Sequence, residues 1–490
     1  MSAPSPGRPG MIRPEDMNYG LNDVPKPFPK AVGLGVQHVL TMFGATVAVP
    51  LLLGPAMGLE GAELAILVSS VMIASGVATI IQVRFGTRLP IIQGVSFAFL
   101  GPFFAIIAAT AGGQVTMQYI AGAIIAGAVL EIILGYGRLF GIIRRFISPV
   151  VIGPVIALIG LALFQVGAPQ AGLNWWLGGG VIVAAFVFSL ILAPRVRFFS
   201  LFPILLAVVV VYLAALVASL TGIIAEGAPG YVSFDPVREA PWFRGVIPGE
   251  GGVIFPWGLP QFSLGFILAT LAGYLASMIE SFGDYYAVGR ASGAGDPTER
   301  QINNGIGAEG VGCALTGVFG GFASTSYTEN IGLVALTKTA SRYVVYIAGI
   351  VLILLGLFTK VGAVIATIPG PIVGGLYCTL FGLIASVGLS NVARADLSSQ
   401  RNLLIIGFLL FMGLSVPAYF AGVEALGYEP VELVIPGAQW LADAIMTVGS
   451  TGMAVAAILG LILDNVIPGT DRERGLVEGP PEPPPTELPE

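Results

Sequence analysis

The stretch from Gly321 to Arg342, GFASTSYTENIGLVALTKTASR, decides how the rest of the chain folds. It lies among long apolar segments, but its own apolar run, 331–336, covers only about one and a half helical turns. A transmembrane helix needs roughly 20 apolar residues, so this stretch cannot cross a bilayer as an ordinary span. Protein or a water-filled cavity must therefore surround its polar groups. These groups belong to Ser324, Thr325, Ser326, Thr328, Glu329 and Asn330.

Thr328 is a candidate N-cap for a short helix that begins near Glu329. Such a helix would direct its positive N-terminus and its free backbone N–H groups into the surrounding cavity. This arrangement predicts a binding site at the polar centre of a membrane protein. The alternative is an ordinary polar loop.

Composition supports a membrane protein. The chain has 490 residues, of which 55% are hydrophobic and only 10% are charged. Windows of 18 or more nearly uncharged residues recur along it, which predicts an all-α polytopic membrane protein in a lipid bilayer. The two cysteines, Cys313 and Cys378, lie in apolar segments and look like buried side chains.

Motifs for other functions were not found in the sequence. It contains no nucleotide-binding Gly-rich loop with its Lys, which argues against ATP-driven transport. Neither a metal-ligand cluster nor a nucleophile triad is present. We therefore expect no enzyme activity, no cofactor, no bound metal and no nucleic-acid partner.

The apolar pattern predicts fourteen membrane spans. Their approximate bounds are 31–53, 62–82, 91–110, 118–136, 147–166, 177–194, 200–222, 263–287, 306–319, 329–339, 342–359, 369–390, 402–420 and 447–466. The chain then divides into a cytoplasmic tail (1–30), a first seven-span half (31–222), an extracytoplasmic loop (223–262), a second seven-span half (263–466) and a disordered cytoplasmic tail (467–490).

The basic residues indicate the orientation. If the N-terminus is cytoplasmic, all but three of the 22 Lys and Arg residues fall on the cytoplasmic side. The exceptions are Arg238, Arg244 and Lys360. By the positive-inside rule, this distribution predicts that both termini are cytoplasmic.

The two halves resemble each other. Residues 149–161, PVVIGPVIALIGL, match residues 371–383, PIVGGLYCTLFGL, at six of thirteen positions. Because each half has an odd number of spans, the second must be inverted, as in secondary transporters. The third span of the first half is also interrupted, by Pro90 and by the run 93–96, QGVS. Paired interruptions of this kind predict a midplane binding site.

Two carboxylates are candidates for this site. Glu280 and Asp284 lie four residues apart in ASMIESFGDYYAV, so they share one helix face. A pair of carboxylates in a poorly solvated site suits reversible protonation. The alternative is a helix end close to water, with Asp284 near the cytoplasmic boundary.

Other ionisable residues within the spans are less clearly functional. His38, the single histidine, is either a packing residue or part of a polar network, and we include it among the proton-coupling candidates. Glu131 lies in the middle of a span, where a bond to a neighbouring helix would account for it, so it stays outside the site. Glu309 is expected at a boundary or in helix packing.

Five stretches together resemble the nucleobase/ascorbate transporter family, which includes uracil and xanthine permeases. They are QHVLTMFGATVAVP (37–50), QGVSFAF (93–99), ESFGDYYA (280–287), INNGIGAEGVGCALTGVFGG (302–321) and TENIGLVALTKTASR (328–342), the last being the family's signature. The resemblance implies fourteen spans in two inverted repeats, with a core domain from spans 1–4 and 8–11 and a gate domain from spans 5–7 and 12–14. Short extended segments in spans 3 and 10 would meet at the substrate, and members are often homodimers.

The resemblance also implies roles for individual residues. Glu280 and Glu329 would accept hydrogen bonds from the N–H groups of a base, the backbone around Thr328 would bind its carbonyls, and Phe97 would stack on its ring. These roles agree with the chemistry of a planar base, which needs carboxylate acceptors, backbone donors and an aromatic face. The predicted substrate-binding set is Phe97, Glu280, Thr328, Glu329, Asn330 and Ser96, and the predicted proton-coupling set is Glu280, Asp284 and His38.

We therefore expect a proton-coupled importer of uracil or a xanthine-type purine in the plasma membrane. Similar xanthine and urate carriers usually have Gln where Glu329 stands, bacterial uracil permeases tend to have His where Asp284 stands, and ESFGDYYA also resembles animal ascorbate carriers. An ascorbate carrier, or a carrier of an anion such as sulfate or a dicarboxylate, is the alternative, with sodium as an alternative coupling ion. Facing carboxylates argue against an anion, and broken helices at a closed midplane site suit alternating access better than a channel.

Overall fold

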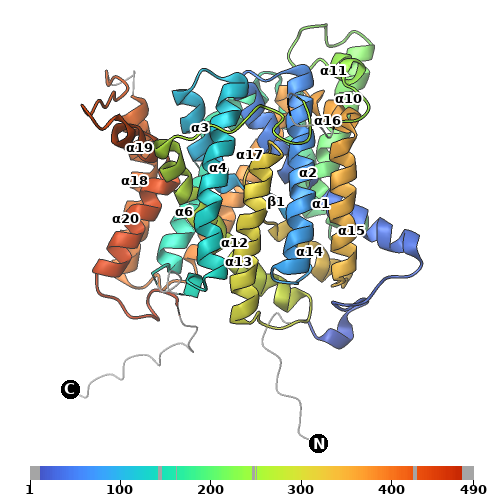
Figure 1. Ribbon diagram of the computed structural model, residues 1–490. Coiled ribbons are helices and arrows are strands. Elements are labelled where there is room, and N and C mark those ends of the chain that lie inside the picture. The colour runs from blue at the N-terminus through green and yellow to red at the C-terminus, as the bar shows by residue number, and fades with distance from the viewer. Residues whose placement is uncertain are drawn as a thin grey trace, which may run out of the picture.

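Helices that run roughly side by side make up most of the protein (Figure 1). The computed structural model describes residues 12–141, 146–161, 163–245, 249, 251–422 and 427–476. Residues 12–27 and 467–476 lie at the same end of the bundle, and the long segment between α10 (Pro203–Leu220) and α12 (Leu264–Ala291) lies at the opposite end (Figure 1).

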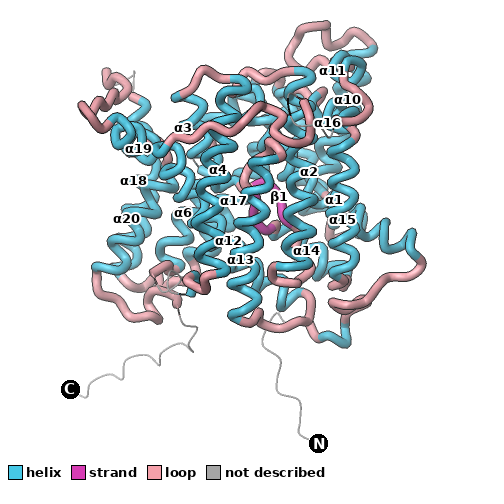
Figure 2. The backbone as a smooth tube through the Cα atoms, viewed as in Figure 1, coloured by secondary structure: helices cyan, strands magenta, loops and turns pink. Residues whose placement is uncertain are grey.

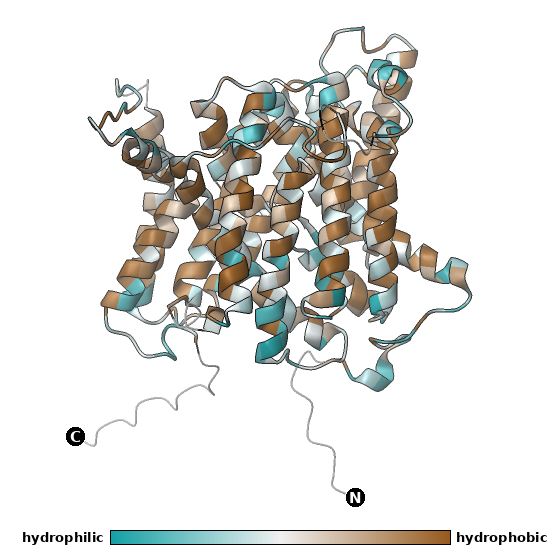
Figure 3. Ribbon diagram, in the orientation of Figure 1, coloured by the Kyte–Doolittle hydropathy of each residue, from teal (hydrophilic) through white to brown (hydrophobic). Residues whose placement is uncertain are grey.

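In the described part of the chain, nine helices are long and apolar enough to cross a membrane. They are α1 (Phe28–Ala56), α2 (Gly61–Phe85), α4 (Gly113–Tyr136), α6 with α7 (Pro149–Leu161 and Phe164–Gly172), α8 with η3 (Trp175–Phe186 and Val187–Leu192), α10, α12, α17 (Gly370–Val392) and α18 (Gln400–Ala421). The pair α19 (Gln439–Gly449) and α20 (Gly452–Val466), bent by 93°, would make a tenth span. Apolar residues line these helices, and hydrophilic residues gather toward both ends of the bundle (Figure 3).

The remaining helices are shorter or more polar. They are η1 (Pro14–Asp16), η2 (Phe97–Phe99), α3 (Leu100–Ala109), α9 (Arg197–Leu201), α11 (Asp235–Glu239), α13 (Glu299–Val318), α14 (Thr328–Thr337), α15 (Arg342–Leu357) and α16 (Thr359–Ala366). Although α13 is rich in Gly and polar residues, most of it is buried. A capping box between Thr298 and Gln301 starts it seven residues before the expected span 306–319.

Because only nine or ten of the described helices are long and apolar enough to cross a membrane, the fourteen expected crossings stay a prediction, and the described elements differ from the expected spans at several places. The segment expected as one span at 447–466 is divided between α19 and α20. Helix α16 occupies a region where we expected a connection. Residues 470–476, which we assigned to a disordered tail, form turns in which Arg474 binds Asp464 of α20 at 2.8 Å. The expected tails at 1–11 and 477–490 lie outside the described residues.

Helix packing falls into two groups. In the first, α13 packs on α4 and α2, α15 packs on α2 and α1, and α12 packs on α4. In the second, α17 packs on α6, α7 and α8, and α18 packs on α20 and α6. The two groups meet mainly where α1 contacts α17 and where α12 contacts α19, α20 and α6. Helix α12 therefore lies at the boundary between the groups.

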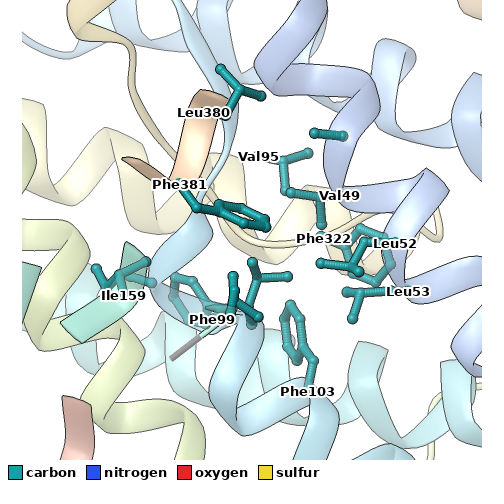
Figure 4. Packing of buried hydrophobic residues seen from close by; sticks show 14 of the residues in the cluster. Val49, Leu52, Leu53, Val95, Phe99, Phe103, Ile159, Phe322, Leu380 and Phe381 are labelled. Carbon is teal, nitrogen blue, oxygen red and sulfur yellow. The ribbon is translucent and has the colours of Figure 1, made fainter. Parts of the chain in front are cut away.

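An aromatic cluster anchors the centre of the first group. The rings of Phe99 and Phe103 stack with centroids 5.7 Å apart, and Phe103 lies 5.4 Å from Phe322 (Figure 4). All three side chains are fully buried. Because Phe99 and Phe103 follow one interrupted segment and Phe322 precedes the other, their burial fixes the two segments against each other.

Candidate functional site

The two interrupted segments form a two-stranded antiparallel sheet inside the helical bundle (Figure 2). Strand β1 (Gln93–Val95) pairs with β2 (Ser324–Ser326), with Gly94 opposite Thr325. Backbone hydrogen bonds continue beyond both ends of this two-stranded sheet. Ser96 N–H donates to Ala323 O at 2.9 Å, and Tyr327 N–H donates to Ile92 O at 3.0 Å. Extended segments are thus present at the two positions that the sequence indicated.

Neighbouring hydroxyl groups satisfy the polar groups of these short strands. The Thr79 hydroxyl accepts from Gln93 N–H at 2.9 Å and lies 3.2 Å from Gln93 O. On the other strand, the Ser281 hydroxyl lies 3.2 Å from Thr325 Oγ1 and 2.9 Å from Ser326 Oγ. Non-helical backbone is tolerated at membrane depth only where protein buries it and forms hydrogen bonds with its polar groups. Here α2 and α12 supply such bonds.

Tyr327 lies across the sheet and links its two strands. Its hydroxyl donates to Val95 O at 2.9 Å. A Cβ atom on Gly94 would lie 2.4 Å from the Tyr327 ring, so this position requires glycine. The ring and the glycine thus fix the distance between β1 and the residue that precedes α14.

Helix α14 begins at Thr328, one residue earlier than we expected. The N-cap position belongs to Tyr327, and no side chain caps the helix, so the predicted capping role of Thr328 is wrong. Extended backbone at Tyr327, held by its bond to Ile92 O, lets the helix begin at the next residue. The Thr328 hydroxyl instead donates to Asp284 Oδ1 at 2.9 Å.

Three carboxylates gather near the start of α14. Thr328 and Glu329 are exposed, Glu280 is half-buried and Asp284 is buried. Glu280 and Asp284 interact electrostatically, and both also interact with Glu329. Asp284 Oδ2 has no hydrogen-bond partner. The structure therefore brings together the carboxylates that the sequence placed on separate segments.

Open space lies beside these carboxylates. Cβ atoms built on Gly283 of α12 and on Gly332 of α14 would meet no atom within 4 Å. The exposed residues of α14, Thr328, Glu329, Gly332 and Leu336, form one stripe along the helix. This stripe runs toward Thr339, which pairs with Tyr19 of the N-terminal segment. The open side thus leads from the strands toward the end of the bundle where both described termini lie.

Phe97 packs against the buried cluster that contains Tyr327 and is itself partly buried. Its ring makes an edge-to-face contact with Phe381 of α17, with centroids 5.9 Å apart. Phe381 in turn stacks on Tyr377 at 5.3 Å. Because α17 belongs to the second packing group, Phe97 lies where the two groups meet.

Three other predicted site residues lie in buried positions. The Ser96 hydroxyl caps η2 by accepting from Ala98 N–H at 3.2 Å. Asn330 Nδ2 donates to His38 O at 2.9 Å and lies 3.1 Å from His38 Nδ1. His38 is thus part of a polar network, one of the two alternatives from the sequence. A substrate contact by Ser96 or Asn330 stays a prediction.

Sequence reasoning missed much of the polar layer behind the strands. Ser277 donates to Glu309 Oε1 at 2.9 Å, and Tyr285 donates to Glu309 Oε2 at 3.0 Å. Glu309 is therefore a buried acceptor rather than a boundary residue. The signal for this layer was the spacing of Ser277 and Ser281, which share one side of α12. Within the described ranges, no group of three or more His, Cys, Asp or Glu side chains could hold a metal ion.

Comparison with known proteins gives concordant matches. A family model described as Permease family (Xan_ur_permease) matches residues 29–422. Solute carrier family 23 member 2 of Rattus norvegicus is 36% identical, over 95% of this chain and 77% of that protein. Nucleobase-ascorbate transporter 1 of Arabidopsis thaliana is 34% identical, over 96% of this chain and 93% of that protein.

Solved structures share the fold at low sequence identity. The murine anion transporter Slc26a9, in its inward-facing state, matches with a TM-score of 0.56 and 10% identity, over 91% of this chain and 69% of that one. The transmembrane domain of the cyanobacterial bicarbonate transporter BicA matches with a TM-score of 0.50 and 17% identity, over 79% of this chain and 95% of that one. These likenesses concern the fold alone.

Proposed function

The chain belongs to the nucleobase/ascorbate transporter family, and from this premise we propose that it imports a nucleobase, uracil or a xanthine-type purine, together with protons. Members of the family are membrane transporters rather than enzymes. Two broken segments that meet at one central site are typical of transporters that work by alternating access.

The electrostatic interaction of Glu280 with Glu329, near the open positions at Gly283 and Gly332, is the observation that carries this proposal. A base presents N–H donors and C=O acceptors along one edge. Carboxylates accept from its N–H groups, whereas the first N–H groups of α14 lack intrahelical partners and can donate to its carbonyls. The positive N-terminus of α14 also favours the oxygen atoms of the base.

Phe97 supplies the remaining feature that a base needs. Its half-buried ring packs near Tyr327, the residue before α14, and offers an apolar surface on which a planar heterocycle can stack. Its contact with Phe381 ties that surface to the second packing group. A bound base would therefore touch both groups at the boundary where they move against each other.

Glu280 is the residue that we assign to proton coupling, with Asp284 and His38 in supporting roles. It lies on α12 at the boundary between the groups and interacts with both Asp284 and Glu329. An uncompensated carboxylate that faces the barrier would cost several kcal/mol, so movement requires that a proton neutralises the site. Substrate and proton would then cross together.

The wider architecture belongs to the same proposal. We assign fourteen crossings in two inverted repeats, 31–222 and 263–466, with the first packing group as core and the second as gate. The basic-residue pattern supports cytoplasmic termini in the plasma membrane. The open side of α14 would then face the cytoplasm. A homodimer is the assembly that the family resemblance suggests.

A second candidate is an ascorbate carrier coupled to sodium. The name of the Arabidopsis relative includes ascorbate. Ascorbate is an anion at neutral pH, however, and three carboxylates near one site would repel it unless bound cations intervened. The carboxylates therefore favour the neutral base.

Uptake by cells that express the chain tests the proposal. Radiolabelled uracil and xanthine are supplied separately, each with an excess of the other base or of ascorbate as competitor. We expect saturable base uptake that the second base reduces and ascorbate does not. Uptake of labelled ascorbate, with no uptake of either base, would overturn the proposal in favour of the second candidate.

A further inference from the structure

A second pair of carboxylates is buried behind the strands, where α4 and α13 approach closely. A Cβ atom on Gly310 would lie 2.8 Å from Ile132 N and 3.1 Å from Ala128 O of α4. This close contact brings Glu131 of α4 and Glu309 of α13 within range of electrostatic interaction. Their exposed fractions are 0% and 1%.

The two carboxylates have unequal surroundings. Glu309 accepts one hydrogen bond from Ser277 and one from Tyr285, whose hydroxyl accepts from Gln82 Nε2 at 2.6 Å. Neither oxygen of Glu131 has a hydrogen-bond partner of normal geometry. Hydroxyl donors stabilise an ionised carboxylate, so Glu309 is the better place for a negative charge.

The other titratable groups around the pair supply no positive charge. Glu131 faces Glu309 and the Cys313 thiol, a weak donor, on α13. On α12 the neighbours are Tyr274, which donates to Ile124 O at 2.6 Å, and Tyr285. In the described part of the chain, neither carboxylate forms an ion pair with Lys or Arg.

We propose that Glu131 and Glu309 hold one resident proton, carried on Glu131 and donated to Glu309. Two buried negative charges with no cation beside them would be very costly here, whereas a protonated Glu131 carries no charge and offers a donor to Glu309. Two ionised carboxylates would carry two negative charges, so after the pair binds one proton it carries one negative charge. This site is separate from the open side and does not depend on which solute the protein carries.

The proton site is joined to strand β2, which leads into α14. Ser277, which binds Glu309, lies 3.5 Å from Ser324 O, and Cys313 Sγ lies 3.3 Å from both Ser324 O and Ser324 N. Glu309 also interacts electrostatically with Glu280. A second charge on the pair would therefore act on β2 and on the residue that we assign to proton coupling.

Infrared spectroscopy of the purified, substrate-free protein tests this inference without any transport measurement. We expect a carbonyl-stretch band of a protonated carboxyl group in the wild type at neutral pH. Glu131→Gln should remove this band. Glu131→Asp should keep the band at a shifted frequency, and this variant tests the proposal if the Gln variant does not fold. Glu239→Gln, at an exposed position, is the matched control and should leave the band in place.

Two results would overturn the proposal. One is a spectrum in which neither Glu131 variant changes any protonated-carboxyl band, because Glu131 would then be ionised. The other is a Glu131-dependent band that sodium removes at fixed pH, which would assign the pair to a metal cation. Because no base is present, failure of this test is distinct from failure of the proposed function.

Discussion

The two strand–helix units at the centre of the protein have the same plan but different chemistry. The first unit runs from β1 through η2 into α3, and the second runs from β2 into α14. In the first unit, the Ser96 hydroxyl caps the helix start and is fully buried. In the second unit, no side chain caps α14, and its first two residues, Thr328 and Glu329, are exposed.

This difference separates a scaffold from a binding surface. In the first unit Ser96 caps the helix start, and its aromatic rings include Phe99, which is buried, and Phe97, which is partly open. The second has an uncapped helix start with an exposed carboxylate, Glu329, where a ligand can bind to the first N–H groups of the helix. Substrate recognition should therefore be concentrated in the second unit and in Glu280, which faces it.

The largest expected effect is loss of proton-driven accumulation when Glu280 is replaced. Glu280→Gln mimics a permanently neutral carboxyl group, so it should abolish uphill uptake of base while exchange of internal for external base continues. Proteoliposomes with an imposed proton gradient, with and without a sodium gradient, provide the measurement. Glu239→Gln is an exposed control. Uphill uptake by the Glu280 variant, or a wild type that follows sodium and ignores pH, would contradict the assignment.

The next effect concerns Glu329 in the second unit. Replacing Glu329 by Gln exchanges one acceptor oxygen for a donor, which leaves a different edge of the base unpaired. We expect the relative preference for uracil and xanthine to shift by about 1.5–3 kcal/mol, the range for a hydrogen bond to a charged group. Competition uptake, normalised to the amount of protein in the membrane, measures it. An unchanged preference would show that Glu329 does not discriminate between the two bases.

The first unit should contribute less, through Phe97. Phe97→Ala removes a stacking surface that is only partly open, so binding should weaken by about 1–2 kcal/mol, at the lower end for base–aromatic stacking. Calorimetry on purified protein measures the affinity, and Phe97→Tyr, which keeps the ring, is the control. Wild-type affinity in the Ala variant would remove Phe97 from the site.

The smallest effect should come from Ser96, where stability is the main readout. Ser96→Ala removes a helix cap, which costs about 1 kcal/mol of unfolding free energy. A lower thermal midpoint in detergent is the expected result, and Ser96→Thr should largely restore it. A loss of base affinity with an unchanged midpoint would make Ser96 a substrate ligand and would erase the distinction between the two units.

Much of the architecture was predictable because it depends on local sequence properties. The apolar windows predicted a polytopic helical protein, and long apolar helices are present. Family membership followed from the quoted motifs and is confirmed by a match over residues 29–422. The interrupted runs around Gln93 and Thr325 indicated two breaks, because a helix that lacks about 20 apolar residues cannot span lipid alone.

The burial of individual polar residues was not predictable in the same way. Ser96, His38 and Glu280 are polar residues in largely apolar segments, whereas Glu329 and Asn330 belong to the polar run 324–330, yet Asn330 is buried and Glu329 is exposed. Sequence spacing shows which residues share a helix face, but it does not show which neighbouring element covers that face. The bonds of Asn330 to His38 join residues 292 positions apart, and no local pattern reports such a contact.

The sequence by itself therefore determined that this protein is a helical membrane transporter, that two of its segments are broken, and that Glu280 and Asp284 share a helix face. The helical membrane fold, the two breaks and the shared helix face follow from hydrophobicity and helical period, which act over a few turns, whereas the transporter function follows from the motifs that resemble the family. Only the tertiary structure decided that β1 pairs with β2, that Thr328 binds Asp284, and that Glu131 meets Glu309. Each of these depends on the close approach of distant helices, which glycines such as Gly310 permit and which packing of the whole bundle fixes.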